Sequence, residues 1–374
     1  MSFTLPRPAE PGMTLSDVDT PALLLDLDAF EANLDHLHAP LAESQIRVRP
    51  HSKSHKCPEI ALRQMARGAV GVCCQKVTEA EAMVAGGIPN VLVSNQVVGP
   101  RKIERLVALA RRARVSVLVD DATNVAALNV AAAEAGTTLD VLIEINVGAN
   151  RCGVEPGKPA VALAELADTS VSLNFKGIHA YQGAAQHVRS PEDRRLLIEL
   201  AVQMVSNTLT LLGEKGIRCD IVTGAGTGTY PLEAASGVYT ELQPGSYIFM
   251  DADYGRNMGT DGKPVHEFQQ SLFVLATVMS RALPGRAVVD AGLKALSVDS
   301  GLPLVADEGA EYLGASDEHG VLRLDDQSRF KLGDKIRLIP GHCDPTVNLY
   351  DWIVGYRGDT VECVWPIAAR GALY

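Results

Sequence analysis

The 374-residue chain lacks several features that would assign it to a common class of protein. Its seven cysteines contain no CxxC pair, which argues against a structural zinc knuckle. Reduced thiols in a cytosolic protein are the simplest interpretation, so we expect a cytoplasmic location. The N-terminal stretch MSFTLPRPAEPGM has no apolar core of a secretory signal, and no run of about 18 apolar residues is present to span a membrane.

The chain also lacks net positive charge, since its formal net charge is -11 at pH 7. Binding to nucleic acid needs a positive surface field, so we do not expect nucleic acid as a partner. Hydrophobic residues make up 47% of the sequence, which is enough to bury a sizeable core. The length favours two domains, or one large domain with an addition.

Short apolar or alternating runs are separated by helical segments between residues 46 and 249. The eight runs are IRVRPHSK, AVGVCCQ, NVLVSN, VSVLVD, LDVLIEINV, FKGIHAY, RCDIVTG and TELQPGSYIF. Strands that alternate with helices pair in parallel through right-handed crossovers. Eight units in about 250 residues are typical of an α/β fold of the (β/α)8 barrel type. A doubly wound open sheet is the alternative that strand count leaves open.

Polar residues follow the ends of these runs, which favours the barrel, because barrel sites lie at the C-terminal ends of the strands. They are Lys53, Gln75, Asn95, Asp120, Asn146, Arg151, Tyr181, Gln182, Thr223 and Gln243. Beyond about residue 260 helical periodicity nearly disappears, and strand-like runs broken by Gly and Pro predict a β-rich domain. We therefore predict a barrel over residues 21–260. Residues 261–374, together with residues 1–20, would form a C-terminal β-rich domain.

The stretch IRVRPHSKSHK places a basic residue at every second position. These residues are Arg47, Arg49, His51, Lys53 and His55. On a strand they would share one face, which in an acidic protein suits a small anion. Lys53, crowded by cations, should have a lowered pKa, and a neutral amine can form a Schiff base with a carbonyl or with pyridoxal phosphate. Lys56 falls on the opposite face, and a solvated surface lysine is the alternative interpretation of Lys53.

Two glycine-containing segments could hold an anion. VTGAGTGTY, residues 222–230, follows the seventh run, and PGSY, residues 244–247, lies within the eighth. Glycines let backbone N–H groups approach a phosphate, and barrels often bind phosphate after strands seven and eight. The segments match neither a Walker A loop nor a GxGxxG loop. Arg151, just after the fifth run, could hold a phenolate or carboxylate, or could form a surface salt bridge.

The segment PGHCDP contains His342 and Asp344, which could share one face toward a divalent ion. Imidazole and carboxylate suit Mn, Co or Mg, whereas the thiolate of Cys343 would favour Zn. An isolated His-x-Asp is usually no metal site. Three further histidines, His179, His187 and His319, are candidates for a general base or for structural roles.

Taken together, these stretches resemble the fold-type III, alanine racemase-like pyridoxal phosphate enzymes, and within them the metal-activated D-threonine aldolases and D-serine dehydratases. The similarity rests on TPALLLDLDAFEANL, RPHSKSHK, CCQKVTEAEAM, NRCG, AYQGAAQH, GAGTGTY, ELQPGSYIFMD, DAGLKALSVDSGLP and SDEHG. It covers nearly the whole chain. Dehydratase-type members place a cysteine two residues after the metal-motif histidine. Here that position is Asp344, which resembles the aldolase branch.

The resemblance implies a set of site residues. The catalytic residues would be Lys53, which carries the cofactor, and His51; the cofactor pocket would contain Gln75, Arg151, Tyr181, Thr223, Gly226, Thr227, Gly245 and Tyr247; the metal ligands would be His342 and Asp344. The expected cofactors are pyridoxal 5'-phosphate and a divalent metal, with Mn preferred over Mg, Co or Zn. A homodimer is also implied.

The expected activity is retro-aldol cleavage of D-3-hydroxy amino acids, chiefly of D-threonine to glycine and acetaldehyde. A closely similar alternative is 3-hydroxy-D-aspartate, which would give glycine and glyoxylate. Elimination of water from D-serine or D-hydroxyaspartate is a second alternative, and Asp344 argues against it. A non-catalytic carrier of the cofactor is a third, which would have no use for the metal motif.

Overall fold

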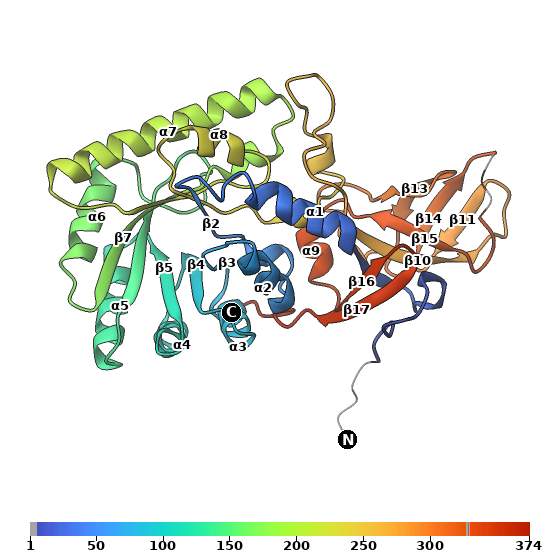
Figure 1. Ribbon diagram of the computed structural model, residues 1–374, viewed down its shortest axis with the longest axis horizontal. Coiled ribbons are helices and arrows are strands. Elements are labelled where there is room, and N and C mark those ends of the chain that lie inside the picture. The colour runs from blue at the N-terminus through green and yellow to red at the C-terminus, as the bar shows by residue number, and fades with distance from the viewer. Residues whose placement is uncertain (1–5, 327, 329) are drawn as a thin grey trace.

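A computed structural model describes residues 6–326, 328 and 330–374 of the protein. The first five residues, which we predict to join the β-rich domain, lie outside the described part. Figure 1 shows two units side by side, a barrel surrounded by helices on the left and a mixed sheet on the right.

The eight predicted runs form one parallel sheet. Its strands are β2 (Arg47–Val48), β3 (Val72–Cys74), β4 (Asn90–Gln96), β5 (Arg114–Val119), β6 (Leu139–Glu144), β7 (Leu173–Ala180), β8 (Ile221–Gly224) and β9 (Glu241–Leu242). The order is β2-β9-β8-β7-β6-β5-β4-β3. A parallel bridge between His51 and Cys73 joins the two ends, and the Cys73 amide donates to Pro50 O at 2.8 Å. The sheet therefore closes, which confirms the barrel and excludes the open sheet.

Helices cover the barrel, and all but the first of them follow its strands. They are α1 (Leu27–His38), α2 (Pro58–Ala66), α3 (Val77–Ala85), α4 (Pro100–Ala110), α5 (Ala122–Glu134), α6 (Lys158–Asp168), α7 (Pro191–Glu214) and α8 (Tyr230–Ala235). Local sequence fixes where several begin, as a side-chain cap binds free backbone amides. Asp121 caps α5 by accepting from the amides of Thr123 and Asn124, and Ser190 caps α7 immediately before Pro191.

The second unit is a nine-stranded mixed sheet. It contains β1 (Ala22–Asp26), β10 (Leu272–Ser280), β11 (Arg286–Val289), β12 (Leu304–Val305), β13 (Ala310–Ala315), β14 (Gly320–Leu324), β15 (Lys335–Ile339), β16 (Trp352–Arg357) and β17 (Thr360–Pro366), with the short helix α9 (Cys343–Val347) after β15. Strand β1 pairs antiparallel with β10 and parallel with β16. It therefore lies in the mixed sheet although its residues fall inside the predicted barrel range. The predicted boundaries themselves stay predictions.

Apolar packing is continuous across the two units. One cluster fills the space between barrel strands and helices, including Val117, Val141 and Leu128. A second joins Leu23 and Phe30 to sheet residues such as Leu338. Because it also includes barrel residues Val48 and Leu242, the mouth of the barrel is held against the sheet.

Helix α7 is long and apolar enough to cross a membrane by length and composition alone. A core helix of a soluble protein passes the same test, so this is weak evidence. The absence of a membrane segment stays a prediction.

Candidate active site

A cavity of about 300 Å³ opens at the C-terminal ends of the barrel strands. It gathers residues from most of the βα-loops, as expected for a barrel. Among the predicted site residues, those that line it are His51, Lys53, Gln75, Arg151, Tyr181, Gly226, Thr227 and Gly245. Its size is at the lower end of the range for cofactor and ligand pockets.

Lys53 lies in a 3-10 turn, η2 (Ser52–Ser54), that directly follows the first barrel strand. Its Nζ is 3.0 Å from Asp344 Oδ2, which comes from α9. The carboxylate raises the pKa of Lys53, so the predicted lowering of that pKa by neighbouring cations is wrong. The error arose because Asp344 lies 291 positions away in the sequence, and only the fold brings it to the lysine.

The alternating basic face is also only partly realised. Strand β2 ends at Val48, and the turn at 52–54 breaks the period of two. Arg49 is buried and donates to Glu241 at 3.0 Å, with Arg47 beside the same carboxylate. His55 is fully buried and accepts from the Cys57 amide. Of the five basic residues, His51 and Lys53 reach the cavity.

His51 is fixed on both sides of its ring. Nδ1 accepts from the Lys53 amide at 3.3 Å, and Nε2 lies 2.9 Å from the Gln75 amide nitrogen and 3.1 Å from Ser94 Oγ. Burial, followed by the charge of Lys53, lowers the pKa of His51 well below its usual value. The ring is therefore neutral and positions the backbone of Lys53. Its catalytic role stays a prediction.

The loop after β8 has the properties of an anion cradle. Ala225 adopts a φ of 69°, and a Cβ at Gly226 would lie 2.4 Å from Gln186 Oε1, so the backbone is pressed close to its support. Thr227 is 7% exposed, and among the described residues its buried Oγ1 has no hydrogen-bond partner. A buried hydroxyl without a partner is costly unless a ligand satisfies it. Thr227 also lines the cavity, so its hydroxyl is a candidate donor to an anionic group there.

Two predicted cofactor residues do not reach the cavity. Tyr247 is fully buried, and its hydroxyl accepts from Gln64 Nε2 at 3.2 Å and lies 3.2 Å from His38 Nε2. The structure therefore contradicts a cofactor contact of Tyr247, which belongs to the core between α1 and α2. Thr223 is also fully buried, and its hydroxyl donates to Glu241 and accepts from the Gln243 amide behind the cavity wall.

Arg151 and Tyr181 form one side of the cavity. The guanidinium lies 5.7 Å from the Tyr181 ring centroid and 4.0 Å from Glu144 Oε1, and its side chain is 54% exposed. Burial raises the pKa of Tyr181, so its hydroxyl stays protonated. Within the described part of the chain Glu144 is its one carboxylate partner, and at 4.0 Å it leaves N–H donors of Arg151 available for a negatively charged oxygen of a ligand.

The metal motif has a donor set suited to a divalent ion. His342 Nδ1 lies 2.8 Å from Asp299 Oδ2. A histidine that donates Nδ1–H to a carboxylate presents a neutral Nε2, as metal-binding histidines do. Burial alone would raise the pKa of Asp344, but Lys53 and His342 hold it down to about 2, so the carboxylate is ionised. Cys343 is fully buried and its pKa is raised well above the usual value, which leaves a poor thiolate ligand.

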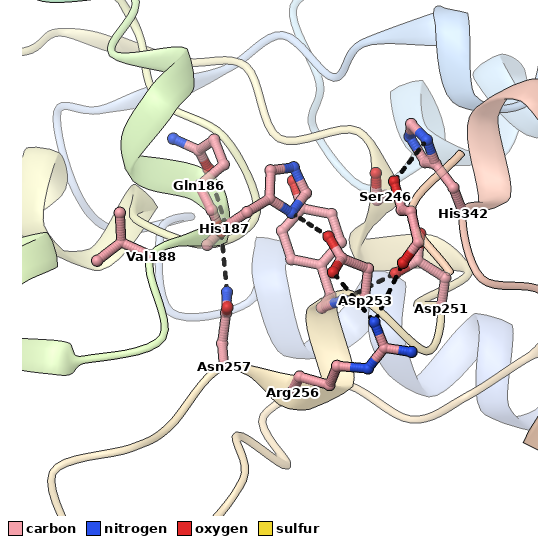
Figure 2. A network of polar contacts seen from close by, with 12 residues as sticks. Gln186, His187, Val188, Ser246, Asp251, Asp253, Arg256, Asn257 and His342 are labelled. Atoms are coloured by element: carbon pink, nitrogen blue, oxygen red, sulfur yellow. Dashed lines mark hydrogen bonds and ion pairs between the residues drawn. The ribbon is translucent and has the colours of Figure 1, made fainter. Parts of the chain in front are cut away.

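Sequence reasoning missed a histidine–aspartate pair beside the cavity. His187 Nδ1 is 2.6 Å from Asp253 Oδ2, and Figure 2 shows the two side chains pointing toward one another. The His187 ring lies 4.8 Å from the ring of Tyr254, which lines the cavity. His187 was one of three candidate histidines, but its partner follows the last barrel strand in FMDADYG, where no pattern marks it. His319 is exposed between β13 and β14.

Comparison with known proteins agrees with this geometry. A family model described as the N-terminal domain of alanine racemase matches residues 25–253, more than half of the chain. The chain belongs to the alanine racemase-like family. A serine dehydratase domain model matches residues 271–356, which contain most of the mixed sheet and the metal motif. The family implies pyridoxal phosphate as cofactor, and the cavity with Lys53, Arg151 and Thr227 has the residues to hold it.

Several members of the family are similar over almost their full length. A D-threonine aldolase from an Arthrobacter species is 49% identical over 99% of this chain and 97% of its own. A 3-hydroxy-D-aspartate aldolase from Paracoccus denitrificans is 49% identical over 98% and 96%. The crystal structure of D-threonine aldolase from Filomicrobium marinum superposes with a TM-score of 0.95 at 51% identity, covering 98% of this chain and all of that one.

Proposed function

We propose that the protein is a pyridoxal phosphate- and divalent metal-dependent aldolase that cleaves D-3-hydroxy amino acids, with D-threonine as the preferred substrate. The observation that carries the proposal is the 3.0 Å contact between Lys53 and Asp344. This contact joins the residue that we assign to the cofactor, Lys53, to a residue that we assign to the metal, Asp344. A substrate held at Lys53 would therefore present its β-hydroxyl beside the motif.

Each group has a distinct task in this proposal. Pyridoxal phosphate, when bound, accepts the electron pair released at the substrate Cα. A divalent ion, when bound, lowers the pKa of the β-hydroxyl. Thr227 would donate to the phosphate and Arg151 to the phenolic oxygen of the cofactor. His342 Nε2 and the Asp344 carboxylate would supply the protein ligands of the ion, with Asp299 fixing the His342 ring.

The His187–Asp253 pair is our candidate for the proton acceptor. Asp253 at 2.6 Å accepts from His187 Nδ1, which leaves Nε2 free to take the hydroxyl proton. Replacing His187 with asparagine should lower kcat by about 100-fold, with the cofactor spectrum intact. An unchanged kcat would exclude this role and leave the proton to a different group.

The choice between two substrates can be argued from charge. A 3-hydroxy-D-aspartate side chain carries a second carboxylate, which an arginine would bind well. Among the described residues, Arg151 is the arginine that lines the cavity, and the proposal uses it for the cofactor. Nearby Arg189 donates to Asp253 and Asn257. This favours D-threonine, whereas the similarity to 3-hydroxy-D-aspartate aldolase keeps that substrate as the second candidate.

Kinetics with purified holoenzyme test the substrate. We expect kcat/KM for D-threonine to exceed that for 3-hydroxy-D-aspartate, with glycine as the common product. The reverse ranking would select the second candidate. Ammonia and a keto acid as the products would instead support a dehydratase.

Replacing His342 with alanine tests the division of labour between metal and cofactor. The variant should lose turnover and keep the absorbance of the bound cofactor. Loss of both would contradict separate sites for the two groups. We also propose manganese as the metal, a homodimer and a cytoplasmic location, which metal analysis, sedimentation equilibrium and cell fractionation would test.

A further inference from the structure

Besides the Lys53–Asp344 ion pair, Lys56 makes a second contact between the segment around η2 and helix α9. The residue is 8% exposed, and its Nζ donates to Asn348 Oδ1 at 2.8 Å. Asn348 is the C-cap of α9, and its backbone N–H donates to the backbone carbonyl of Asp344, one turn earlier. The side chain of Lys56 is thus buried against α9 instead of lying on a solvated face.

The Lys53–Asp344 and Lys56–Asn348 contacts join the same two segments side by side. Asp344 and Asn348 are four apart, so their side chains lie on one face of α9. Lys53 lies in the 3-10 turn, Lys56 lies two residues after its end with a φ of 50°, and both side chains reach α9. The Lys53–Asp344 ion pair is the first contact and the Lys56–Asn348 hydrogen bond is the second contact between residues 53–56 and α9.

Residues near the end of the chain donate hydrogen bonds to both members of the second contact, Lys56 and Asn348. The Ala369 amide donates to Lys56 O at 3.0 Å, and the Gly371 amide donates to Asn348 Oδ1 at 3.4 Å. Both donors to Oδ1 are N–H groups, which fixes the orientation of the Asn348 amide. The Thr78 amide on α3 then donates to Tyr374 O, and Figure 1 shows the chain end beside α3. The tail thus runs from the mixed sheet back to the barrel.

We propose that Lys56 and Asn348 are positioning residues for the metal site, and that they hold α9 in register while Lys53 serves the cofactor. Lys53 Nζ cannot both react with a carbonyl and hold Asp344 as an ammonium ion. The Lys53–Asp344 ion pair is therefore lost when the cofactor is loaded, whereas the Lys56–Asn348 hydrogen bond involves no group that the cofactor uses. This inference rests on the proposed metal site at His342 and Asp344.

The test measures Mn²⁺ affinity of the pyridoxal phosphate-loaded protein, from the electron paramagnetic resonance signal of free Mn²⁺. Lys56→Met and Asn348→Leu should each weaken Mn²⁺ binding about 10- to 100-fold, as loss of a residue that orients metal ligands does. Cofactor content and absorbance should stay unchanged. Asn348→Asp keeps the acceptor and should bind Mn²⁺ like the wild type. The double variant should bind Mn²⁺ no more weakly than Asn348→Leu alone, because that change already removes the Lys56 hydrogen bond.

Lys335→Met is the matched control. Lys335 donates to Val18 O at 2.9 Å and to Thr277 Oγ1 at 3.1 Å, so it is also a lysine that ties chain segments together, but away from α9. Wild-type affinity in Lys56→Met and Asn348→Leu, or an equal loss in Lys335→Met, would overturn the inference alone. If His342→Ala binds Mn²⁺ as tightly as the wild type, the proposed metal site fails, and the inference fails with it.

Discussion

Replacing Thr227 with valine should change stability and cofactor affinity in opposite directions. The hydroxyl is buried and has no partner among the described residues. Such a group costs about 1–3 kcal/mol, and valine removes the hydroxyl while keeping the β-branched shape of the side chain. The cofactor-free variant should therefore be more stable by about that amount. In the holoenzyme the same change deletes a hydrogen bond to phosphate worth about 1.5–3 kcal/mol, or roughly 10- to 100-fold in affinity.

Two measurements on the same preparation test this prediction. Urea unfolding of the cofactor-free protein gives the change in the free energy of unfolding, and titration with pyridoxal phosphate, followed by absorbance, gives the affinity. Thr229→Val is the matched control, because the Thr229 hydroxyl accepts from Gln186 and donates to Glu233, both at 2.8 Å. That variant should be less stable by about 1–3 kcal/mol. A Thr227→Val protein that is less stable, or binds the cofactor as before, would refute the assignment of a phosphate cradle.

Three further predictions concern single residues. Burial raises the pKa of Glu233 from 4.5 to about 7, so the contribution of Glu233 to the free energy of unfolding should be complete below pH 4.5 and fall by about 3 kcal/mol as the pH rises through 7. In urea unfolding at pH 5 and pH 8, Glu233→Gln should lose this dependence, whereas Glu134→Gln, at an exposed position, should keep it. Tyr247→Phe should lower the free energy of unfolding by about 1 kcal/mol and leave cofactor affinity unchanged in the same titration; weaker binding would restore Tyr247 to the site. Asp299→Ala should weaken Mn²⁺ binding about 10- to 100-fold at constant cofactor absorbance, and unchanged affinity would refute its role in orienting His342.

Hydrophobic periodicity predicted the eight barrel strands, and the polar residues at their ends favoured a barrel over the open sheet. All eight apolar runs became strands, because parallel barrel strands are buried and contrast with the amphipathic helices between them. Residues 22–26, which pair within the mixed sheet, show the limit of this signal. The run ALLLD is buried whichever sheet it joins, and its pairing with β10 depends on residues 250 positions away.

The site was predicted as far as motifs place residues on loops. Gly226 and Thr227 follow the seventh barrel strand and reach the cavity, as their position indicates. Tyr247 lies on the next loop, but η4 (Ser246–Ile248) turns its side chain into the core. Side-chain direction in short 3-10 turns cannot be read from spacing. Partners from the other unit, above all Asp344 at Lys53, were beyond reach because they depend on tertiary structure.

A product assay on metal-stripped protein, loaded with pyridoxal phosphate and supplied with D-threonine, tests the central claim most directly. Glycine and acetaldehyde that form on addition of Mn²⁺, and not without it, are the result we predict. The same preparation with His342→Ala should stay inactive at any Mn²⁺ concentration. Metal-dependent 2-oxobutyrate and ammonia would contradict the account and assign the protein to the dehydratases.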